Sequence, residues 1–295
     1  MKPCVLALGF FDGVHIGHGR LLRRVRQIAD ARNITAAAIT FDRHPASFLS
    51  GVHTPLINTV SERVLLMEQQ YGIDEVYVLT FDDAFCSIPW QDFAQMIRAQ
   101  YGAEHIVCGF DYRFGAKGEG TPRHMAQFCE ENGIGFDAIG AVELEGTVVS
   151  STYIRAALQD GRMQEACRFL GHPHLLSGTV VGGCRIGRTL GIPTANMQIA
   201  ESILLPKCGV YAARANVEGE CYPAVVNIGM RPTFDGKTLT VEPWLLDFDR
   251  DIYGKEITLE LFSYLREERR FETKEALQTE IYRNEKTVRE LWKGL

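Results

Sequence analysis

Apolar positions in the first half of the chain follow two alternating patterns. Short continuous apolar runs, typical of buried strands, cover residues 5–10, 36–41, 76–79, 105–109 and 136–142. Between them, apolar residues recur every three or four positions, which predicts helices over residues 18–32, 61–71, 90–101 and 122–132. Ser61 is the candidate N-cap of the second helix. This alternation predicts an α/β fold with a parallel sheet, whose ligands bind beyond the carboxyl ends of the strands.

The pattern changes in the second half. Two short helices are predicted over residues 151–159 and 162–170, and Gly171-His172-Pro173 marks a boundary between domains 1–172 and 173–295. Strand patterns then follow one another without helices between them, at residues 177–181, 211–217, 222–227, 238–248 and 257–264. Such a succession predicts an antiparallel β-barrel. An amphipathic helix over residues 273–292 is expected to pack on this barrel.

Composition narrows the class of protein. A chain of 295 residues with 46% hydrophobic and 23% charged residues is long enough for two cores. The net charge is −6 and neither half is basic, which argues against a non-specific nucleic-acid binder. No apolar run approaches the roughly 18 residues of a membrane span, the N-terminus reads as a strand, and the eight cysteines form no C-x-x-C pair. We therefore expect a cytoplasmic protein with reduced thiols.

The first candidate site is the turn between the first strand and the first helix. Gly13 and Gly17 remove side chains where a nucleotide would approach, and a helix N-terminus there offers unpaired N–H groups and partial positive charge. His15 and His18 flank the turn as possible donors to a phosphate. Two alternatives stay open at this point: an ordinary strand-to-helix turn, and a zinc site built on the two histidines.

Further candidate groups fall at other strand ends and at a helix start. Residues 149–155 place hydroxyl groups and Arg155 at a predicted helix N-terminus, which suits a triphosphate or pyrophosphate and equally suits a simple helix cap. Residues 41–45 and 108–115 each follow a predicted strand and carry aromatic and polar side chains. Because both would lie at the same sheet edge, they indicate a site where a planar ring could stack.

Together these motifs resemble one known family. Residues 9–18 (GFFDGVHIGH), 109–115 (GFDYRFG) and 150–155 (SSTYIR) look like the adenylyltransferase half of the bifunctional bacterial riboflavin kinase/FMN adenylyltransferases, also called FAD synthetases. Residues 187–196 (GRTLGIPTAN), 227–234 (NIGMRPTF) and 241–248 (VEPWLLDF) are similar to the riboflavin kinase half, in the same order. The resemblance implies a Rossmann-like nucleotidyltransferase sheet followed by a riboflavin kinase barrel with a C-terminal helix.

For the first half, the resemblance implies the transfer of AMP from ATP to FMN, with release of pyrophosphate. His15 and His18 would be catalytic, holding the ATP phosphates and stabilising charge. The other residues implied to bind ATP there are Gly9, Phe10, Asp12, Gly17, Ser151, Thr152 and Arg155. Those implied to contact the flavin or nucleotide are Phe41, His44, Pro45, Asp111 and Arg113.

For the second half, the resemblance implies the phosphorylation of riboflavin by ATP. Glu242 matches the general base of the family, and Thr194 and Asn196 match the oxygen ligands of Mg²⁺. The implied ATP-binding residues are Gly182, Gly187, Arg188 and Gly191. Pro243 departs from an ordinary strand pattern because it lacks an N–H, which suggests a strand edge or a bulge that could displace the carboxylate.

Three other readings are weighed against the bifunctional enzyme. One keeps adenylyl transfer and loses the kinase, with Pro243 as its motive. A second is a flavin or nucleotide sensor that binds without turnover. A third is a class I aminoacyl-tRNA synthetase, which also carries a His-x-Gly-His site. The expected partners are riboflavin, FMN and ATP, with Mg²⁺ as cofactor and without nucleic acid or membrane, and the chain is expected to be a monomer or a weak oligomer.

Overall fold

The computed structural model describes residues 2–182, 192–233 and 236–294, and the side chains of residues 231–238 are not described. The chain divides into two compact units, Met1–Ser151 and Thr152–Leu295. Each unit has its own sheet, and each is described by itself below. The division assigns the predicted helices over residues 151–170 mainly to the second unit, so a functional boundary after residue 172 stays a prediction.

The first unit contains a five-stranded sheet in the order β3-β2-β1-β4-β5. All of its neighbouring strands are parallel, as the alternating pattern predicts. The strands are β1 (Cys4–Leu8), β2 (Thr35–Phe41), β3 (Glu75–Leu79), β4 (Ala103–Gly109) and β5 (Gly135–Ile139). From β1 the chain adds β2 and β3 on one side, and then β4 and β5 on the other side. The carboxyl ends of β1 and β4 therefore flank the point where open parallel sheets bind their ligands.

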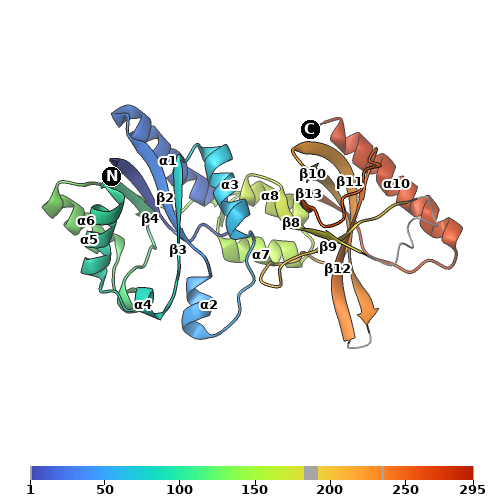
Figure 1. The fold of residues 1–295 in the computed structure, drawn as a ribbon, viewed down its shortest axis with the longest axis horizontal. Helices are drawn as coiled ribbons and strands as arrows, with labels where there is room; N and C mark the ends of the chain where they lie inside the picture. Colours follow the sequence, from blue (N-terminus) through green and yellow to red (C-terminus); the bar gives the residue numbers. More distant parts are fainter. Residues whose placement is uncertain (1, 183–191, 234–235, 295) are drawn as a thin grey trace. The chain divides into compact units, whose positions relative to one another are not determined.

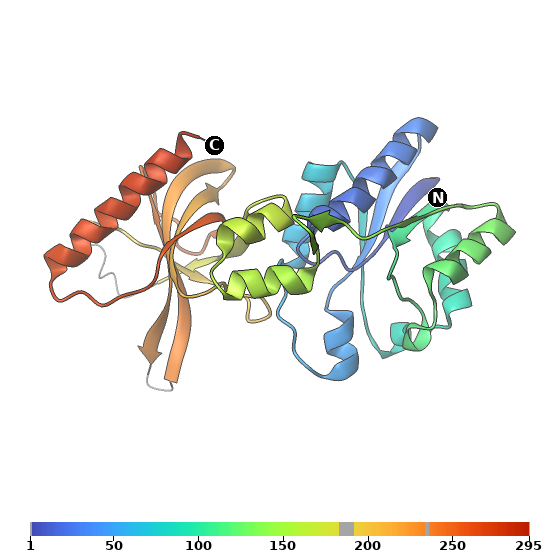
Figure 2. The same cartoon turned by 180° about the vertical axis from the view of Figure 1, so that it is seen from behind.

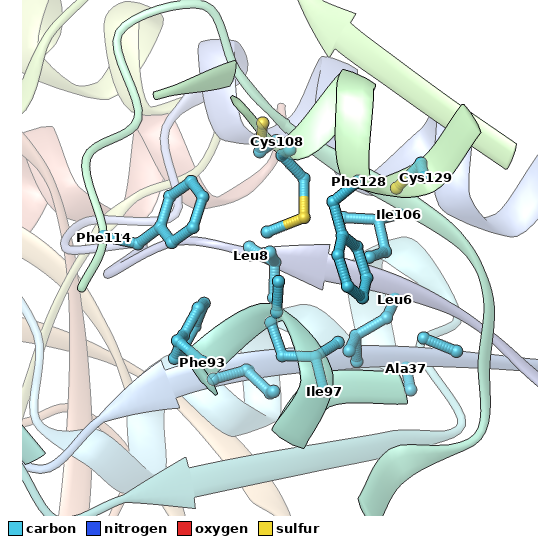
Figure 3. Close-up of a cluster of buried hydrophobic side chains, with 14 of the residues drawn as sticks. Leu6, Leu8, Ala37, Phe93, Ile97, Ile106, Cys108, Phe114, Phe128 and Cys129 are labelled. Atoms are coloured by element: carbon cyan, nitrogen blue, oxygen red, sulfur yellow. The ribbon is translucent and has the colours of Figure 1, made fainter. Parts of the chain in front are cut away.

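Helices cover both faces of this sheet (Figures 1 and 2). One face carries α1 (Ile16–Arg32) and α3 (Val60–Tyr71), and the other carries α5 (Trp90–Tyr101) and α6 (Pro122–Asn132). Val5 and Ala7 face α1, whereas Leu6 and Leu8 face the helices on the other side. Figure 3 shows Leu6 and Leu8 among the side chains of that second layer. Because both faces are covered, the central strands β1 and β2 are almost entirely apolar and buried, whereas the edge strands β3 and β5 are more exposed.

Several short elements of the first unit were not predicted. These are α2 (Pro45–Ser50), α4 (Asp83–Cys86), the 3₁₀ turn η1 (Ala116–Gly118), β6 (Glu143–Leu144) and β7 (Thr147–Val148). The predicted N-cap Ser61 is wrong. Thr59 caps α3, because its hydroxyl accepts the Glu62 N–H while the Glu62 carboxylate accepts the Thr59 N–H, which is a capping box.

The second unit is built on a closed barrel in the order β10-β11-β12-β9-β8-β13, and all of its strand pairs are antiparallel. The strands are β8 (His174–Val181), β9 (Asn196–Gln198), β10 (Gly209–Val217), β11 (Glu220–Thr233), β12 (Gly236–Leu245) and β13 (Glu256–Arg266). Before them come α7 (Ser151–Gln159) and α8 (Met163–Leu170), and α10 (Lys274–Trp292) follows them. α8 packs on β8 and β13, and α10 packs on β10 and β11. The predicted barrel and terminal helix are therefore confirmed.

Pro243 neither ends β12 nor produces a bulge against β11. It pairs with Val226 in an unbroken register, and its carbonyl oxygen accepts the N–H of Ala195 at 2.9 Å. In an antiparallel strand the N and C=O of one residue point to the same side. The backbone nitrogen of Pro243, which has no hydrogen, therefore points toward β9, and the pairing of β9 with β12 is short. The hydrogen bonds between β12 and β11 do not need this missing N–H. The expected bulge is wrong, because the strand stays regular at Glu242. An edge position agrees with the short pairing on the β9 side.

Two candidate active sites

The turn after β1 is tightly coiled. Phe11, Gly13 and Val14 all have positive φ, at 57°, 82° and 38°, and Phe11 and Val14 are fully buried. Side-chain-bearing residues rarely adopt such angles, and they concentrate where a structure holds a functional loop. A Cβ on Gly9 would lie 2.8 Å from the Phe11 ring. Gly9 is therefore required by the protein's own packing.

His15 and His18 form a stacked pair at the start of α1. His15 is the N-cap, and its Nδ1 accepts the backbone N–H of His18 at 3.2 Å. The two imidazole rings are nearly parallel, with centroids 3.6 Å apart and an interplanar angle of 12°. A Cβ on Gly17 would lie 3.1 Å from the His15 ring. Gly17 thus makes room for an imidazole, whereas the sequence suggested room for a nucleotide.

The imidazole of His18 is held neutral. Burial lowers its pKa well below the usual 6.5, and the neighbouring His15 and Arg63 lower it further. Its Nδ1 is buried without a hydrogen-bond partner among the described residues. A neutral imidazole carries one donor and one acceptor. His18 therefore has unused hydrogen-bonding capacity at the N-terminus of a helix, where anions are favoured.

Asp12 and Ser151 organise the turn. The Asp12 carboxylate, 2% exposed, accepts the backbone N–H of Ile57 at 3.0 Å and that of Asn58 at 3.4 Å. Its carbonyl oxygen accepts the hydroxyl of Ser151 at 2.8 Å. Ser151 is the first residue of α7, so this bond fixes the start of that helix beside the turn. The carboxylate that was expected to bind ATP thus faces backbone amides of the protein.

Thr152 and Arg155 follow Ser151 in α7 and belong to the second unit. Thr152 lies in the first turn of the helix, where backbone N–H groups lack partners within the helix, and Arg155 comes one turn later. Thr152 is exposed and Arg155 is half-buried.

The sheet unit holds an aromatic cavity of about 420 Å³, and Phe10, in the turn after β1, is one of the residues that line it. This volume is in the range of small-molecule sites. Phenylalanine rings form most of its wall, supplied by Phe10, Phe41, Phe81, Phe85, Phe93 and Phe114. The predicted Pro45, Asp111 and Arg113 also line it. The structure therefore brings together segments 41–45 and 108–115, and it places Phe10 in the same wall.

His44 does not line that cavity, but it holds α2, which carries a residue that does. It caps α2 through its Nδ1, which accepts the Ser47 N–H at 3.3 Å, and its ring meets the ring of Phe10 edge-on at 5.0 Å. α2 carries Leu49, which lines the cavity although its side chain is 64% exposed. His44 therefore positions one wall of the cavity.

Two charged residues of the first unit were missed. Lys117 lines the cavity in a left-handed conformation (φ 54°), between two glycines of the 115–118 turn. The glycines are a turn signal that could have drawn attention to it. Arg63 is fully buried on α3, where helical periodicity alone predicts an exposed position for an arginine. No sequence pattern distinguished it from a surface cation.

In the barrel, the residues expected to serve the kinase lie on adjacent strands. Val241 of β12 pairs with Met197 of β9, which sets Glu242 opposite Asn196. On the other side, Glu242 pairs with Asn227 of β11. Residues directly opposite one another in a sheet share a face. Asn196, Glu242 and Asn227 therefore form a row across three strands, and all three are half-buried.

A second cavity, of about 390 Å³, lies in the barrel unit, and it is lined by residues 193–195, which directly precede Asn196. Pro193, Thr194 and Ala195 form one wall. Phe248, the last residue of the 241–248 motif, and residues 249–253, which the sequence did not single out, form another. Gly182 is exposed just after β8. The predicted Gly187, Arg188 and Gly191 lie outside the described residues.

The donor set at residues 194–196 suits Mg²⁺ chemically. Mg²⁺ prefers oxygen ligands and usually keeps substrate phosphates and waters among them. The Thr194 hydroxyl and the Asn196 amide supply such oxygens. Within the part of the chain that the structure describes, no group of three or more His, Cys, Asp or Glu residues could hold a metal ion.

None of the helices in the described residues is long and apolar enough to cross a membrane. The seven described cysteines are free thiols, and burial raises the pKa of Cys4 and of Cys108 to about 12. Cys184 lies outside the described residues.

Comparison with known proteins agrees with the two sites. The family model described as FAD synthetase matches residues 1–153, and that described as riboflavin kinase matches residues 170–292. The bifunctional riboflavin kinase/FMN adenylyltransferase of Listeria monocytogenes is 36% identical over 295 residues, covering 97% of this chain and 91% of that protein. The enzyme of the same name from Escherichia coli K12 is 34% identical over 293 residues, covering 99% and 93%.

A solved structure shares the whole fold. A crystal structure described as a macrolide-efflux protein from Streptococcus pneumoniae matches with a TM-score of 0.87 at 31% identity, covering 98% of this chain and 94% of that chain. The two family models, the full-length relatives and the two cavities beside their respective motifs agree with one another. This chain belongs to the family of bifunctional riboflavin kinase/FMN adenylyltransferases.

Proposed function

We propose that this chain makes FAD from riboflavin in two steps at two separate sites. In the barrel unit, riboflavin and ATP give FMN and ADP. In the sheet unit, FMN and a second ATP give FAD and pyrophosphate. The observation that carries the proposal is that each unit holds its own cavity beside its own family motif.

Adenylyl transfer needs positioning and charge stabilisation rather than a base. The attacking group is the phosphate of FMN, which is already an anion, so no proton has to be removed. His15 and His18 hold the phosphates of ATP at the N-terminus of α1, and His18 uses the hydrogen-bonding capacity that the protein leaves unsatisfied. Asp12 and Gly9 act by shaping the turn that presents the two rings.

The leaving pyrophosphate is assigned to the 150–155 motif on the family resemblance. Ser151 is anchored to the carbonyl oxygen of Asp12, and it leads directly into Thr152. The Thr152 hydroxyl and the Arg155 guanidinium, assigned from the 150–155 motif, are suited to the charge that develops on pyrophosphate.

The aromatic cavity of the sheet unit receives the flavin. Its phenylalanine walls match a flat, largely apolar isoalloxazine ring, and offset or edge-to-face contacts hold such rings. Asp111 provides a hydrogen-bond acceptor at the cavity wall. Arg113 and Lys117 are exposed, and no ion pair of either is found within the described ranges. They provide the positive charge that an FMN phosphate requires and riboflavin does not.

The kinase step starts with a neutral hydroxyl group and therefore needs a base. Glu242 accepts the proton of the terminal ribityl hydroxyl as that oxygen attacks the γ-phosphorus of ATP, and ADP leaves. The regular register of β12 at Pro243 keeps Glu242 beside Asn196, so Pro243 gives no reason to exclude the kinase. Thr194 and Asn196 would hold Mg²⁺, which neutralises charge on the ATP phosphates when it is bound. Thr194 also forms the wall of the barrel cavity where the nucleotide lies.

One incubation tests the proposal. The pure chain is mixed with riboflavin, ATP and Mg²⁺, and the flavins are separated by chromatography over time. FMN should appear first and FAD later. FAD formed from added FMN but not from riboflavin would leave only the adenylyltransferase, and tight flavin binding with neither product would mean a binding protein. An amino-acid-dependent exchange of pyrophosphate into ATP would instead indicate a synthetase.

A further inference from the structure

One buried cation in the sheet unit has no part in the proposed steps. The side chain of Arg63 is fully buried on α3. Its Nη1 donates to the carbonyl oxygens of Phe10 and Phe41, at 3.0 Å each, and to the Thr40 hydroxyl at 2.8 Å. The Thr40 hydroxyl in turn donates to the Phe10 carbonyl oxygen at 2.7 Å. A single nitrogen of Arg63 therefore joins the carboxyl ends of β1 and β2.

The rest of the guanidinium is unsatisfied. Nε and Nη2 are buried and have no hydrogen-bond partner among the described residues. A buried unpaired donor costs free energy, so a protein retains such a group where its charge is useful. Burial lowers the pKa of Arg63 to about 10, and the negative charge of Asp12 opposes that shift. Arg63 therefore remains a cation at neutral pH.

Arg63 contacts the wall of the flavin cavity and is connected to the histidine pair through Phe10 and Phe11. Its guanidinium packs on the Phe10 ring, 4.4 Å from the ring centroid, and Phe10 and Phe41 are both wall residues of the flavin cavity. The Phe10 carbonyl that accepts from Arg63 leads into Phe11, whose ring meets the ring of His18 edge-on with centroids 5.3 Å apart, and the charge of Arg63 lowers the pKa of His18. Because a buried charge is weakly screened, it acts over this range more strongly than a surface charge.

We propose that Arg63 is a positioning residue for adenylyl transfer, which fixes the aromatic wall of the flavin cavity and places a permanent positive charge beside His18. This inference rests on the proposed function of the first unit. The charge has two effects. It favours the ATP phosphates electrostatically, and it disfavours a second positive charge on His18, which then serves as a neutral hydrogen-bonding group.

The charged and titratable groups acting around His18 are known from the structure. They are His15, stacked on its ring, and Arg63, on α3, with Asp12 as the acidic neighbour of Arg63. Removing the Arg63 charge relieves a repulsion that opposes protonation of His18. The His18 pKa should therefore rise in a neutral variant.

Three variants separate charge from geometry. Arg63→Met removes both the charge and the hydrogen bonds. Arg63→Lys keeps the charge but cannot bridge the same acceptors. Thr40→Val leaves the charge and removes the hydroxyl from the network. The His18 side-chain titration is followed by NMR, with its signal assigned by comparison with His18→Asn. The kcat and the KM for FMN and ATP are measured for FAD formation.

In Arg63→Met, the His18 midpoint should move upward and kcat/KM for ATP should fall roughly tenfold or more. In Arg63→Lys and Thr40→Val, the midpoint should stay in place while KM for FMN rises a fewfold. An unchanged midpoint in Arg63→Met, or an upward shift in Arg63→Lys, would overturn the inference. So would Arg63→Met losing no more FAD formation than Thr40→Val. If Arg63→Met does not fold, Arg63→Lys and Thr40→Val still test the inference, because an upward shift of the His18 midpoint in Arg63→Lys would overturn it. A wild-type chain that makes no FAD would instead refute the proposed function.

Discussion

The Nδ1 atom of His15 accepts the backbone N–H of His18 at 3.2 Å, while the two imidazole rings stack with their centroids 3.6 Å apart. One side chain thus has two tasks. It caps α1, and it holds the second histidine in a fixed plane at the helix N-terminus. Stability and adenylyl transfer are therefore linked at His15, and substitutions can separate them.

Replacing His15 by asparagine should keep the cap and lose the stacked ring. Asparagine is a good N-cap, so the free energy of unfolding should stay near that of wild type, whereas His15→Ala should lower it by about 1 kcal/mol. FAD formation from FMN should fall roughly a hundredfold in both variants. Urea denaturation and FMN adenylylation assays measure the two quantities. Wild-type FAD formation by His15→Asn would exclude a catalytic part for this ring.

The stability of the barrel unit should depend on pH through His174. This residue is fully buried at the start of β8. Its pKa is lowered from 6.5 to about 3, mainly by burial and to a smaller extent by the charge of His172. Between these values the unfolded chain binds a proton that the folded chain does not. The free energy of unfolding therefore decreases as pH falls below 6.5, by up to about 1.4 kcal/mol per pH unit.

Urea denaturation between pH 7 and 4, followed on the barrel transition, measures that slope. In His174→Leu the slope should be smaller, because the titrating group is gone. His53→Gln, at an exposed histidine, serves as the control and should keep the wild-type slope. Equal slopes in wild type and His174→Leu would show that another group is responsible.

Glu242→Gln should separate the two activities. The amide cannot accept the ribityl proton, so FMN formation should fall by roughly a hundredfold to ten-thousandfold. Conversion of added FMN to FAD should remain, because it needs no base and takes place in the other unit. Glu256→Gln, at an exposed carboxylate on β13, is the matched control for the kinase assay. A Glu242→Gln variant that still phosphorylates riboflavin at the wild-type rate would reject the carboxylate as base.

Lys117→Gln should weaken the binding of FMN to the sheet unit. Loss of one charge at the cavity should raise KM for FMN in FAD formation roughly fivefold. KM for riboflavin in the kinase step should not change, since that substrate binds in the barrel. Arg123→Gln removes an exposed cation from α6 that does not line the cavity, and it should leave both KM values unchanged. An equal effect of the two substitutions would indicate general electrostatics only.

Gly9→Ala should destabilise the turn after β1 by a steric clash. The new Cβ would lie 2.8 Å from the ring of Phe11, which is 1% exposed and cannot move into solvent. We expect a loss of about 1–3 kcal/mol in the free energy of unfolding and a lower rate of FAD formation. Gly140→Ala is the control, because a Cβ there meets nothing within 4 Å. Wild-type stability of Gly9→Ala would show that the Phe11 ring can shift without cost.

The central strands of the sheet could be predicted because both of their faces are buried. β1 is apolar throughout, and such a run is visible without any knowledge of its neighbours. β9 could not be predicted in this way. It has three residues, Asn196–Gln198, and no pattern of its own, so only its pairing with β8 and β12 makes it a strand. Likewise, the polar residue that caps α3 was misplaced by two positions, since Thr59 and Ser61 are equally good caps by type.

By itself the sequence determined the order of the elements, the two fold classes and the chemical groups available to each site, because these follow from local patterns and motifs. The tertiary structure alone decided which groups meet. Arg63 is buried against Phe10 because α3 packs on one sheet face, and Glu242 stands beside Asn196 because the barrel closes through β9. Contacts between residues distant in the chain depend on packing, which leaves no periodic trace in the sequence.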